Sequence, residues 1–355
     1  MPLLPLFGHH ALRDRLDEQV ARGALPASLL LQGPPGVGKQ RLALWLGQRL
    51  LCTGTTPPCG ECQHCKYMQA GAHPDLRWYF PLPRLKDSAD IALDEVEELY
   101  RGAIAERLES HGLYARADGL AALFVYVTRL IVQQATRTPA MAARKVFVVG
   151  DADRMVPQAS SPEAANAFLK LLEEPPADTT LILTTSEPGA LLPTIRSRVV
   201  IVRVPPLADA DVRAFLAAPE VREALGKRAG ADDELVAMAA GAPGSLLSAT
   251  DRGAAVARAR ALLDAARGAP DARLRAAFTQ GSSKARGAFS DVLDALTVLL
   301  RDDARDAAAR GDASLALASS KAVIHVENAK RAAEGNAIPQ LVTADLLSHL
   351  AELGR

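Results

Sequence analysis

The sequence lacks an excess of charge of either sign, since its 355 residues include 41 basic and 41 acidic side chains. This balance argues against a protein that binds nucleic acid mainly by neutralising backbone phosphates, which needs a positive surplus. Aromatic residues are also scarce, at 4%, and the abundance of alanine, leucine and arginine is typical of a helix-rich protein. The length allows two or three domains with a buried core.

The sequence also lacks an uninterrupted apolar run of about 18 residues, the length that a membrane-spanning helix requires. Its first ten residues, MPLLPLFGHH, have neither the basic start nor the apolar centre of a signal peptide. We therefore predict a cytoplasmic location and no membrane partner. The two histidines that close this segment, His9 and His10, are predicted to lie on the solvated surface.

Cysteine is scarce as well, and the four that occur lie close together: Cys52, Cys59, Cys62 and Cys65. Disulfides are improbable in a reducing cytoplasm, whereas four thiolates in the spacing C-x6-C-x2-C-x2-C can enclose a zinc ion. Because sulfur would then fill every tetrahedral position, the predicted zinc is structural, and unbound thiols are the alternative. His64 lies within the cluster and could compete as a zinc ligand, but it is predicted to face solvent instead.

A glycine-rich segment, GPPGVGKQ at residues 33–40, contains the complete phosphate-loop pattern G-x-x-x-x-G-K from Gly33 to Lys39. Backbone N–H groups around Gly36 and Gly38 and the lysine ammonium hold nucleotide phosphates in such loops. A serine or threonine normally follows the lysine and ligates magnesium. Gln40 stands there instead, so the pattern predicts a degenerate loop with weak or no ATP binding.

Apolar runs around this loop indicate a parallel α/β sheet with both faces covered by helices. A strand at residues 27–32 leads into the loop, and apolar residues at helical spacing follow Lys39. A helix is predicted with Ser161 as N-cap and Pro162 at its first position, and the segment EEPP at 173–176 is predicted to end it, because proline cannot continue a helix. Further strands are predicted at 76–80, 145–149, 181–185 and 199–204.

The rest of the chain lacks strand-like runs. Residues from about 81 to 123 include a helical stretch at 91–108 and are interpreted as an insertion, to which the sequence assigns no role. After Pro205 and Pro206 the sequence becomes helical, with a break at residues 241–244. We therefore predict a sheet domain over 1–205, a small helical domain over 206–250 and an all-helical domain over 251–355.

Four segments together resemble one family: the phosphate loop, the cysteine cluster that follows it in the sequence, ANAFLKLLEEPP at 165–176 and TIRSRV at 194–199. Over residues 7–206, apart from the insertion, the chain resembles bacterial clamp-loader subunits of DNA polymerase III, most closely the delta-prime family. The resemblance implies an AAA+ P-loop (RecA-like) domain with an inserted zinc knuckle, a helical lid and a C-terminal helical collar for oligomerisation. It also implies a hetero-pentameric ring with gamma/tau and delta subunits, which loads a sliding clamp onto primed DNA.

Three positions depart from the ATP-hydrolysing members of this family. Gln40 replaces the magnesium ligand, Gly150 stands where an acidic pair should begin, and Ser245 stands where active relatives place a phosphate-sensing arginine. Of the expected acidic pair, only Asp151 is present in this sequence. Together these changes predict that the chain does not turn over ATP. Thr184 and Thr185 are accordingly predicted to be core and strand-edge residues, and Trp45 and Trp78 to be packing residues.

The arginine of the segment Arg196-Ser197-Arg198 is retained, although Val199 replaces the cysteine of the family's Ser-Arg-Cys motif. The resemblance implies that Arg198 is an arginine finger, which projects into the ATP site of a neighbouring subunit. A guanidinium suits this role because it is always charged and forms a planar fork against phosphate oxygens. The alternative is an ordinary surface salt bridge.

Three functions follow from these observations. The leading hypothesis is a non-catalytic subunit that acts as a rigid stator and completes a neighbour's ATP site through Arg198. The alternative is an active AAA+ ATPase, the motor subunit of a clamp loader or a related remodelling enzyme, in which Gln40 and Asp151 serve magnesium. A zinc-dependent nucleic-acid-binding module is disfavoured, because only Lys66 and Tyr67 near the cysteines suit that role.

Overall fold

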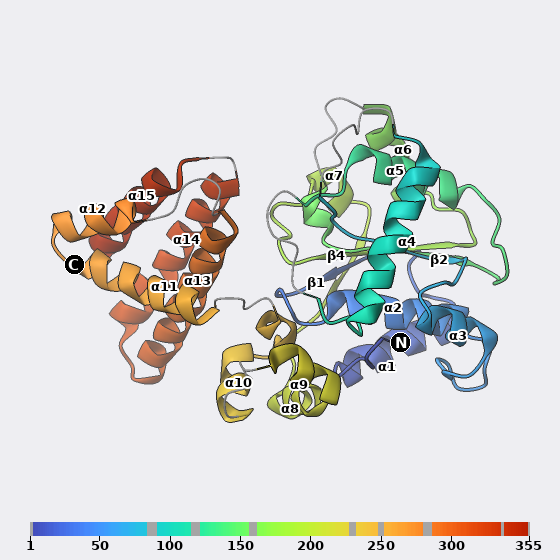
Figure 1. Cartoon of the computed structure of the whole chain (residues 1–355), viewed down its shortest axis with the longest axis horizontal. Helices are drawn as coiled ribbons and strands as arrows, with labels where there is room; N and C mark the ends of the chain where they lie inside the picture. The colour runs from blue at the N-terminus through green and yellow to red at the C-terminus, as the bar shows by residue number, and fades with distance from the viewer. Residues whose placement is uncertain are drawn as a thin grey trace. The chain divides into compact units, whose positions relative to one another are not determined.

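The computed structural model describes residues 3–83, 91–114, 121–155, 162–226, 232–247, 252–279, 286–334 and 337–353. The chain divides into two compact units, Met1–Ser248 and Ala249–Arg355 (Figure 1). The first unit contains the sheet and the second is helical. Among the residues described, no helix is both long enough and apolar enough to cross a membrane.

A five-stranded parallel sheet forms the centre of the first unit, in the order β2-β3-β4-β1-β5. Every residue of β3 and β4 is buried, which explains their continuous apolar runs, since parallel strands are covered on both faces. The five strand predictions are confirmed to within two residues at each end: β1 Ser28–Gln32, β2 Leu76–Tyr79, β3 Lys145–Val149, β4 Thr179–Thr185 and β5 Val200–Arg203.

Helices cover both faces of this sheet, as predicted. In Figure 1, α2 lies on one side of the strands, and α5 and α6 lie on the other. The helices of this part are α1 His10–Ala21, α2 Lys39–Leu51, α3 Gln63–Gln69, α4 Leu93–Glu109, α5 Val125–Ala135, the short η1 Ala152–Arg154, α6 Pro162–Glu173 and α7 Pro193–Arg196. Their buried side chains form one core with the strands.

The predicted helix that ends before two prolines is α6, which ends at Glu173. Its inward side chains Phe168 and Leu172 are buried in the sheet core. Ser161, the predicted N-cap, lies outside the described residues. Within the predicted insertion, α4 follows the helical stretch that the sequence indicated, and residues 84–90 and 115–120 lie outside the described part.

A second, smaller core lies beyond the sheet in the same unit. It is built by α8 Asp209–Ala217, α9 Pro219–Leu225, α10 Asp232–Ala239 and the short η3 Pro243–Leu246. Leu4 and Phe7 of the N-terminal segment pack into it, and the ring of Phe7 meets that of Phe215 edge-on at 5.5 Å.

The second unit is a helical bundle with its own core, in which Leu293, Leu296, Val326 and Leu347 are fully or almost fully buried. Helix α13 packs along α11 and α14, and α15 packs against α11, α12 and α14. The helices are α11 Arg252–Arg267, α12 Pro270–Phe278, α13 Arg286–Ala309, α14 Ala313–Glu334 and α15 Pro339–Leu353.

Candidate functional site

The phosphate loop joins the end of β1 to the start of α2. Gly36 and Gly38 have φ angles of 78° and 94°, a left-handed conformation that side chains other than glycine rarely adopt. Gly38 is also the N-cap of α2. The sequence therefore builds a tight turn that ends at a helix N-terminus, the arrangement that binds phosphate in other loops of this kind.

The ammonium of Lys39 is engaged within this loop. Its Nζ donates to the carbonyl oxygen of Gly33 at 3.0 Å, to that of Pro34 at 2.8 Å and to Oγ of Ser186 at 2.8 Å. The residue is 5% exposed. Because an ammonium has three N–H donors, a phosphate could bind Lys39 only by displacing one of these partners.

The loop is also covered by neighbouring backbone. The N–H of Gly244 in η3 donates to the carbonyl oxygen of Gly36 at 2.9 Å. A methyl group on Gly36 would lie 2.4 Å from the nitrogen of Ser245, so η3 packs directly on the loop. Nε2 of His9 lies 2.9 Å from the carbonyl oxygen of Val37. The surface prediction is therefore wrong for His9, which is buried against the loop, and right for His10, which is exposed.

Gln40 is buried beside the loop, and its side-chain oxygen is fully used. Oε1 accepts from Nε1 of Trp78 at 3.0 Å, from the hydroxyl of Tyr114 at 3.0 Å and from Nη1 of Arg107 at 3.3 Å. An amide oxygen has two lone pairs, so these three donors leave no electron pair for a metal. Trp78 is thus both a packing residue, as predicted, and a hydrogen-bond donor.

The space at Gly150 is filled by the side chain of Gln40. A methyl group there would lie 2.5 Å from both Cδ and Nε2 of Gln40, closer than unbonded atoms approach. The same Nε2 donates to Oδ2 of Asp151 at 3.2 Å. The remaining acid of the pair, Asp151, is therefore hydrogen-bonded to Gln40. The side chain of Gln40 also occupies the space that a side chain at position 150 would need.

A positive charge from the predicted insertion completes this cluster. The guanidinium of Arg107, on α4, lies 3.2 Å from the ring centroid of Phe80 and 3.6 Å from that of Tyr114. Burial lowers the pKa of Arg107, and the carboxylate of Asp151 opposes that shift. A guanidinium nevertheless stays protonated in proteins. Arg107 therefore brings a permanent cation next to the side chain that replaces the magnesium ligand.

The two threonines at the end of β4 are buried, as expected of core residues. Oγ1 of Thr184 accepts from the backbone N–H of Asp151 at 3.0 Å, and Oγ1 of Thr185 donates to Oδ1 of Asp153 at 2.6 Å. Both hydroxyls therefore hold the turn that follows β3. Trp45 packs against the sheet core, and the guanidinium carbon of Arg13 lies 5.0 Å from its ring centroid.

Arg198 lies between α7 and β5, and its side chain is 29% exposed. Its Nε donates to Oε2 of Glu173 at 3.1 Å, and its Nη1 donates to the carbonyl oxygen of Thr194 at 2.9 Å and to Oγ of Ser197 at 3.4 Å. Within the described part of the chain, none of these partners belongs to the phosphate loop.

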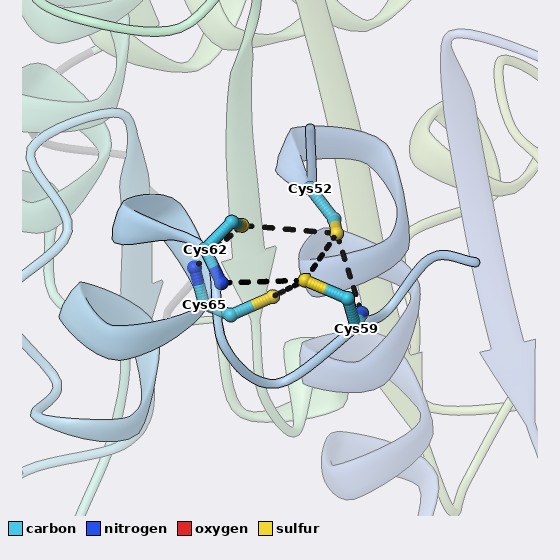
Figure 2. Close-up of side chains that lie close together, drawn as sticks. All are labelled: Cys52, Cys59, Cys62 and Cys65. Carbon is cyan, nitrogen blue, oxygen red and sulfur yellow. Dashed lines mark hydrogen bonds between the residues drawn. The ribbon is translucent and has the colours of Figure 1, made fainter. Parts of the chain in front are cut away.

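The four cysteines, which lie between the end of α2 and the first turn of α3, meet in a single cluster (Figure 2). Sγ of Cys52 lies 3.5 Å from that of Cys59 and 3.8 Å from that of Cys62, and the sulfurs of Cys59 and Cys65 are 4.0 Å apart. All four lie within 4.8 Å of one another. Tetrahedral zinc with Zn–S bonds of about 2.3 Å separates its sulfurs by about 3.8 Å, so the donor set fits structural zinc.

Backbone amides around the cluster favour thiolates. The N–H groups of Gly54 and Cys59 each donate to the sulfur of Cys52 at 3.3 Å, and that of Cys62 donates to the sulfur of Cys59 at 3.3 Å. Burial opposes ionisation of Cys62, but hydrogen bonds from the amides of Cys65 and Thr53 and from the neighbouring thiols lower the pKa of this thiol to about 5. Burial raises the pKa of Cys65 to about 12, so the amides favour the thiolate at Cys62 and not at Cys65. Ionised sulfurs are the form that binds metal.

His64 does not face solvent, contrary to the prediction. It is 9% exposed, and its Nδ1 lies 2.9 Å from Nε2 of His73. Nδ1 of His73 in turn accepts from the backbone N–H of Asp75 at 3.0 Å. The imidazole is therefore part of a buried pair that joins the cysteine segment to the start of β2.

Curated subunits of DNA polymerase III match about half of this chain. A delta' subunit of DNA polymerase III from Pseudomonas aeruginosa is 34% identical over 219 residues, which cover 60% of this chain and 52% of that protein. A gamma/tau subunit from Mycobacterium bovis is 28% identical over 195 residues, covering 54% and 27%. The chain spans about half the length of the curated delta' relatives it matches.

Among solved structures, a DNA polymerase III gamma subunit-related protein from Thermotoga maritima aligns with 96% of this chain and 99% of its own, at 18% identity and a TM-score of 0.37. The family described as DNA polymerase III, delta subunit matches residues 8–113 and 122–208. These ranges include the phosphate loop, the cysteine cluster and Arg198. Because this match covers more than half of the chain, the chain belongs to the DNA polymerase III delta subunit family.

Proposed function

We propose that this chain is a non-catalytic subunit of the DNA polymerase III clamp loader. In this role it would not hydrolyse ATP at its own loop, and it would complete the ATP site of a neighbouring subunit through Arg198. The family membership and the similarity to delta' and gamma/tau subunits support a place in the clamp loader. The division into a sheet domain (1–205), a helical lid (206–250) and a collar (251–355) belongs to the same proposal.

The cluster around Gln40 is the observation that carries the non-catalytic assignment. Its amide oxygen receives three hydrogen bonds, its amide nitrogen binds Asp151, and Arg107 adds a cation beside it. Magnesium bound at this place would have to break those bonds and tolerate the guanidinium. Because phosphoryl transfer depends on that metal, the arrangement disfavours turnover at the chain's own loop.

The fixed phosphate loop is consistent with a stator. Lys39 is bound to loop carbonyls and to Ser186, and η3 is hydrogen-bonded to Gly36. Movement of the lid relative to the loop would break the hydrogen bond between Gly244 and Gly36. A subunit of this kind would keep one shape while its ATP-binding neighbours move.

The main assembly surface would lie in the helical collar, residues 251–355. Large apolar side chains on this unit remain exposed, and exposed apolar surface of this kind suits a protein partner. Its partners would be gamma/tau and delta subunits in a hetero-pentameric ring that acts on the sliding clamp and primed DNA in the cytoplasm. Among the described residues of this unit, the exposed large apolar side chains are Leu274, Phe278, Val298, Leu315, Leu317, Ile324, Ile338 and Leu341.

Structural zinc is the second part of the proposal. Cys52, Cys59, Cys62 and Cys65 would each supply one thiolate, so no coordination position would remain for water or substrate. The bound ion would hold the segment between α2 and α3 in place and would take no part in a reaction.

The direct test is ATP binding and hydrolysis by the purified chain in the presence of Mg²⁺. We expect no hydrolysis above that of a Lys39→Ala variant, which measures contaminating activity. We also expect no magnesium-dependent quenching of tryptophan fluorescence on addition of ATP, since Trp78 reports on Gln40. Turnover that disappears in Lys39→Ala would show that the chain is a motor subunit instead.

A further inference from the structure

The environment of Arg198 includes a carboxylate from the last residue of α6. Oε2 of Glu173 accepts from Nε of Arg198 at 3.1 Å, and Nη1 of the same guanidinium binds Thr194 and Ser197. These partners come from α6, from α7 and from the turn between α7 and β5. The guanidinium is thus held on two of its three nitrogens by groups from separate elements.

The third nitrogen is left for another molecule. Within the part of the chain that the structure describes, no hydrogen-bond partner is found for Nη2 of Arg198, and the side chain is 29% exposed. A guanidinium bound at Nε and Nη1 presents the two N–H groups of Nη2 in a fixed direction, because its atoms are coplanar. This geometry suits an acceptor such as a phosphate oxygen.

From these contacts we infer that Glu173 is a positioning residue for Arg198. The carboxylate binds Nε and restricts the rotamers of a long side chain, while Nη2 has no hydrogen-bond partner in the described residues. The inference rests on the proposed role of Arg198 in a neighbour's ATP site. Its consequence is that Glu173 acts on hydrolysis by another subunit without touching the nucleotide.

Both partners are themselves held by the fold. Helix α6 buries Phe168 and Leu172 in the sheet core, and α7 buries Ile195 in the same core. The ends of the two helices therefore have fixed positions, and the Glu173–Arg198 contact joins them. An orienting contact of this kind acts mainly on the transition state, where precise placement of charge matters.

The test uses a clamp loader reconstituted from this chain and its gamma/tau and delta subunits. The Arg198-dependent rate is the DNA-stimulated ATPase of the wild-type complex minus that of the Arg198→Ala complex. We expect Glu173→Gln to lower this part of the rate by about two- to fivefold, the effect of losing one partly exposed ion pair. The KM for ATP should stay unchanged, because the lost contact acts on the transition state.

Two further variants separate positioning from a general structural effect. Glu174→Gln removes the adjacent exposed carboxylate and should leave the rate at the wild-type level. In the Arg198→Ala background, Glu173→Gln should have no additional effect, since its influence passes through the guanidinium.

The possible failures are distinguishable. An unchanged rate in Arg198→Ala would refute the proposed function itself. A loss in Arg198→Ala without a loss in Glu173→Gln would overturn only the positioning role. A loss in Glu173→Gln that persists in the Arg198→Ala background would also overturn it, because Glu173 would then act independently of Arg198.

Discussion

Substitution of Gly150 by alanine tests whether Gln40 occupies the place of the missing acid. The added methyl group would lie 2.5–2.6 Å from Cδ, Nε2 and Oε1 of Gln40. The glutamine cannot easily move away, since Trp78, Tyr114, Arg107 and Asp151 all bind its amide. Forcing a methyl group into such a site costs about 1–3 kcal/mol, and each buried hydrogen bond that breaks adds about 1 kcal/mol.

We therefore expect Gly150→Ala to lower the free energy of unfolding of the first unit by about 2–4 kcal/mol. Urea unfolding followed by tryptophan fluorescence measures this unit selectively, because both tryptophans of the chain, Trp45 and Trp78, lie in it. Gly189→Ala is the matched control. No atom lies within 4 Å of a methyl group at that position, so its effect should stay within about 0.5 kcal/mol.

A second background isolates the contact. In Gln40→Ala, the three atoms that the methyl group would strike are absent, so Gly150→Ala should cost less than about 0.5 kcal/mol there. An equal cost in both backgrounds would refute the reasoning. It would mean that Gly150 is required for some reason other than Gln40.

Two further predictions concern the cysteine cluster and its neighbouring histidines. The purified chain should contain about one zinc per molecule by atomic absorption. The double variant Cys59→Ser, Cys62→Ser should lose the zinc and unfold more easily, since structural zinc contributes roughly 10–16 kcal/mol of binding free energy in isolated fingers. A wild-type chain that contains no metal and is as stable as one with zinc would contradict this prediction. Burial lowers the pKa of His73 to about 4, so between pH 6.5 and 4 only the unfolded chain takes up this proton. Acidification to pH 4 should thus lower the free energy of unfolding by roughly 3 kcal/mol through this group, and a His73→Asn variant that retains the full pH dependence would exclude it.

Much of the fold could be predicted because its signals are local in sequence. Buried parallel strands are continuous apolar runs, and the run at residues 145–149 predicts both ends of β3. The end of α6 followed from two prolines that cannot continue a helix. The cysteine cluster followed from spacing, because four thiols so close along the chain have few other ways to be used.

The contacts made by the insertion could not be predicted. Arg107 and Tyr114 reach Gln40 from 67 and 74 residues away along the chain, and nothing local marks either side chain as part of the phosphate-loop cluster. In the sequence, the missing side chain at Gly150 and the larger side chain at Gln40 are two separate departures from the pattern of the ATP-hydrolysing relatives. Only the three-dimensional contact shows that one residue fills the space left by the other.

The errors have a similar origin. His9 and His64 were expected in solvent because histidine is often found at surfaces, but each is buried with a specific partner, Val37 and His73 respectively. Burial of a polar ring depends on whether a distant acceptor is available. Sequence alone does not contain that information.

The DNA-stimulated ATPase of the reconstituted clamp loader with Arg198→Ala tests the central claim most directly. Arg196→Ala is the matched control, since Arg196 is exposed two residues away and bonds only weakly to Pro188, at 3.5 Å. We predict normal assembly for both variants and a loss of ATPase activity for Arg198→Ala alone. The loss can reach the whole rate contributed by the one ATP site that Arg198 completes, because arginine fingers accelerate hydrolysis about 10³- to 10⁵-fold at their sites. Unchanged ATPase in a correctly assembled Arg198→Ala complex would contradict the account.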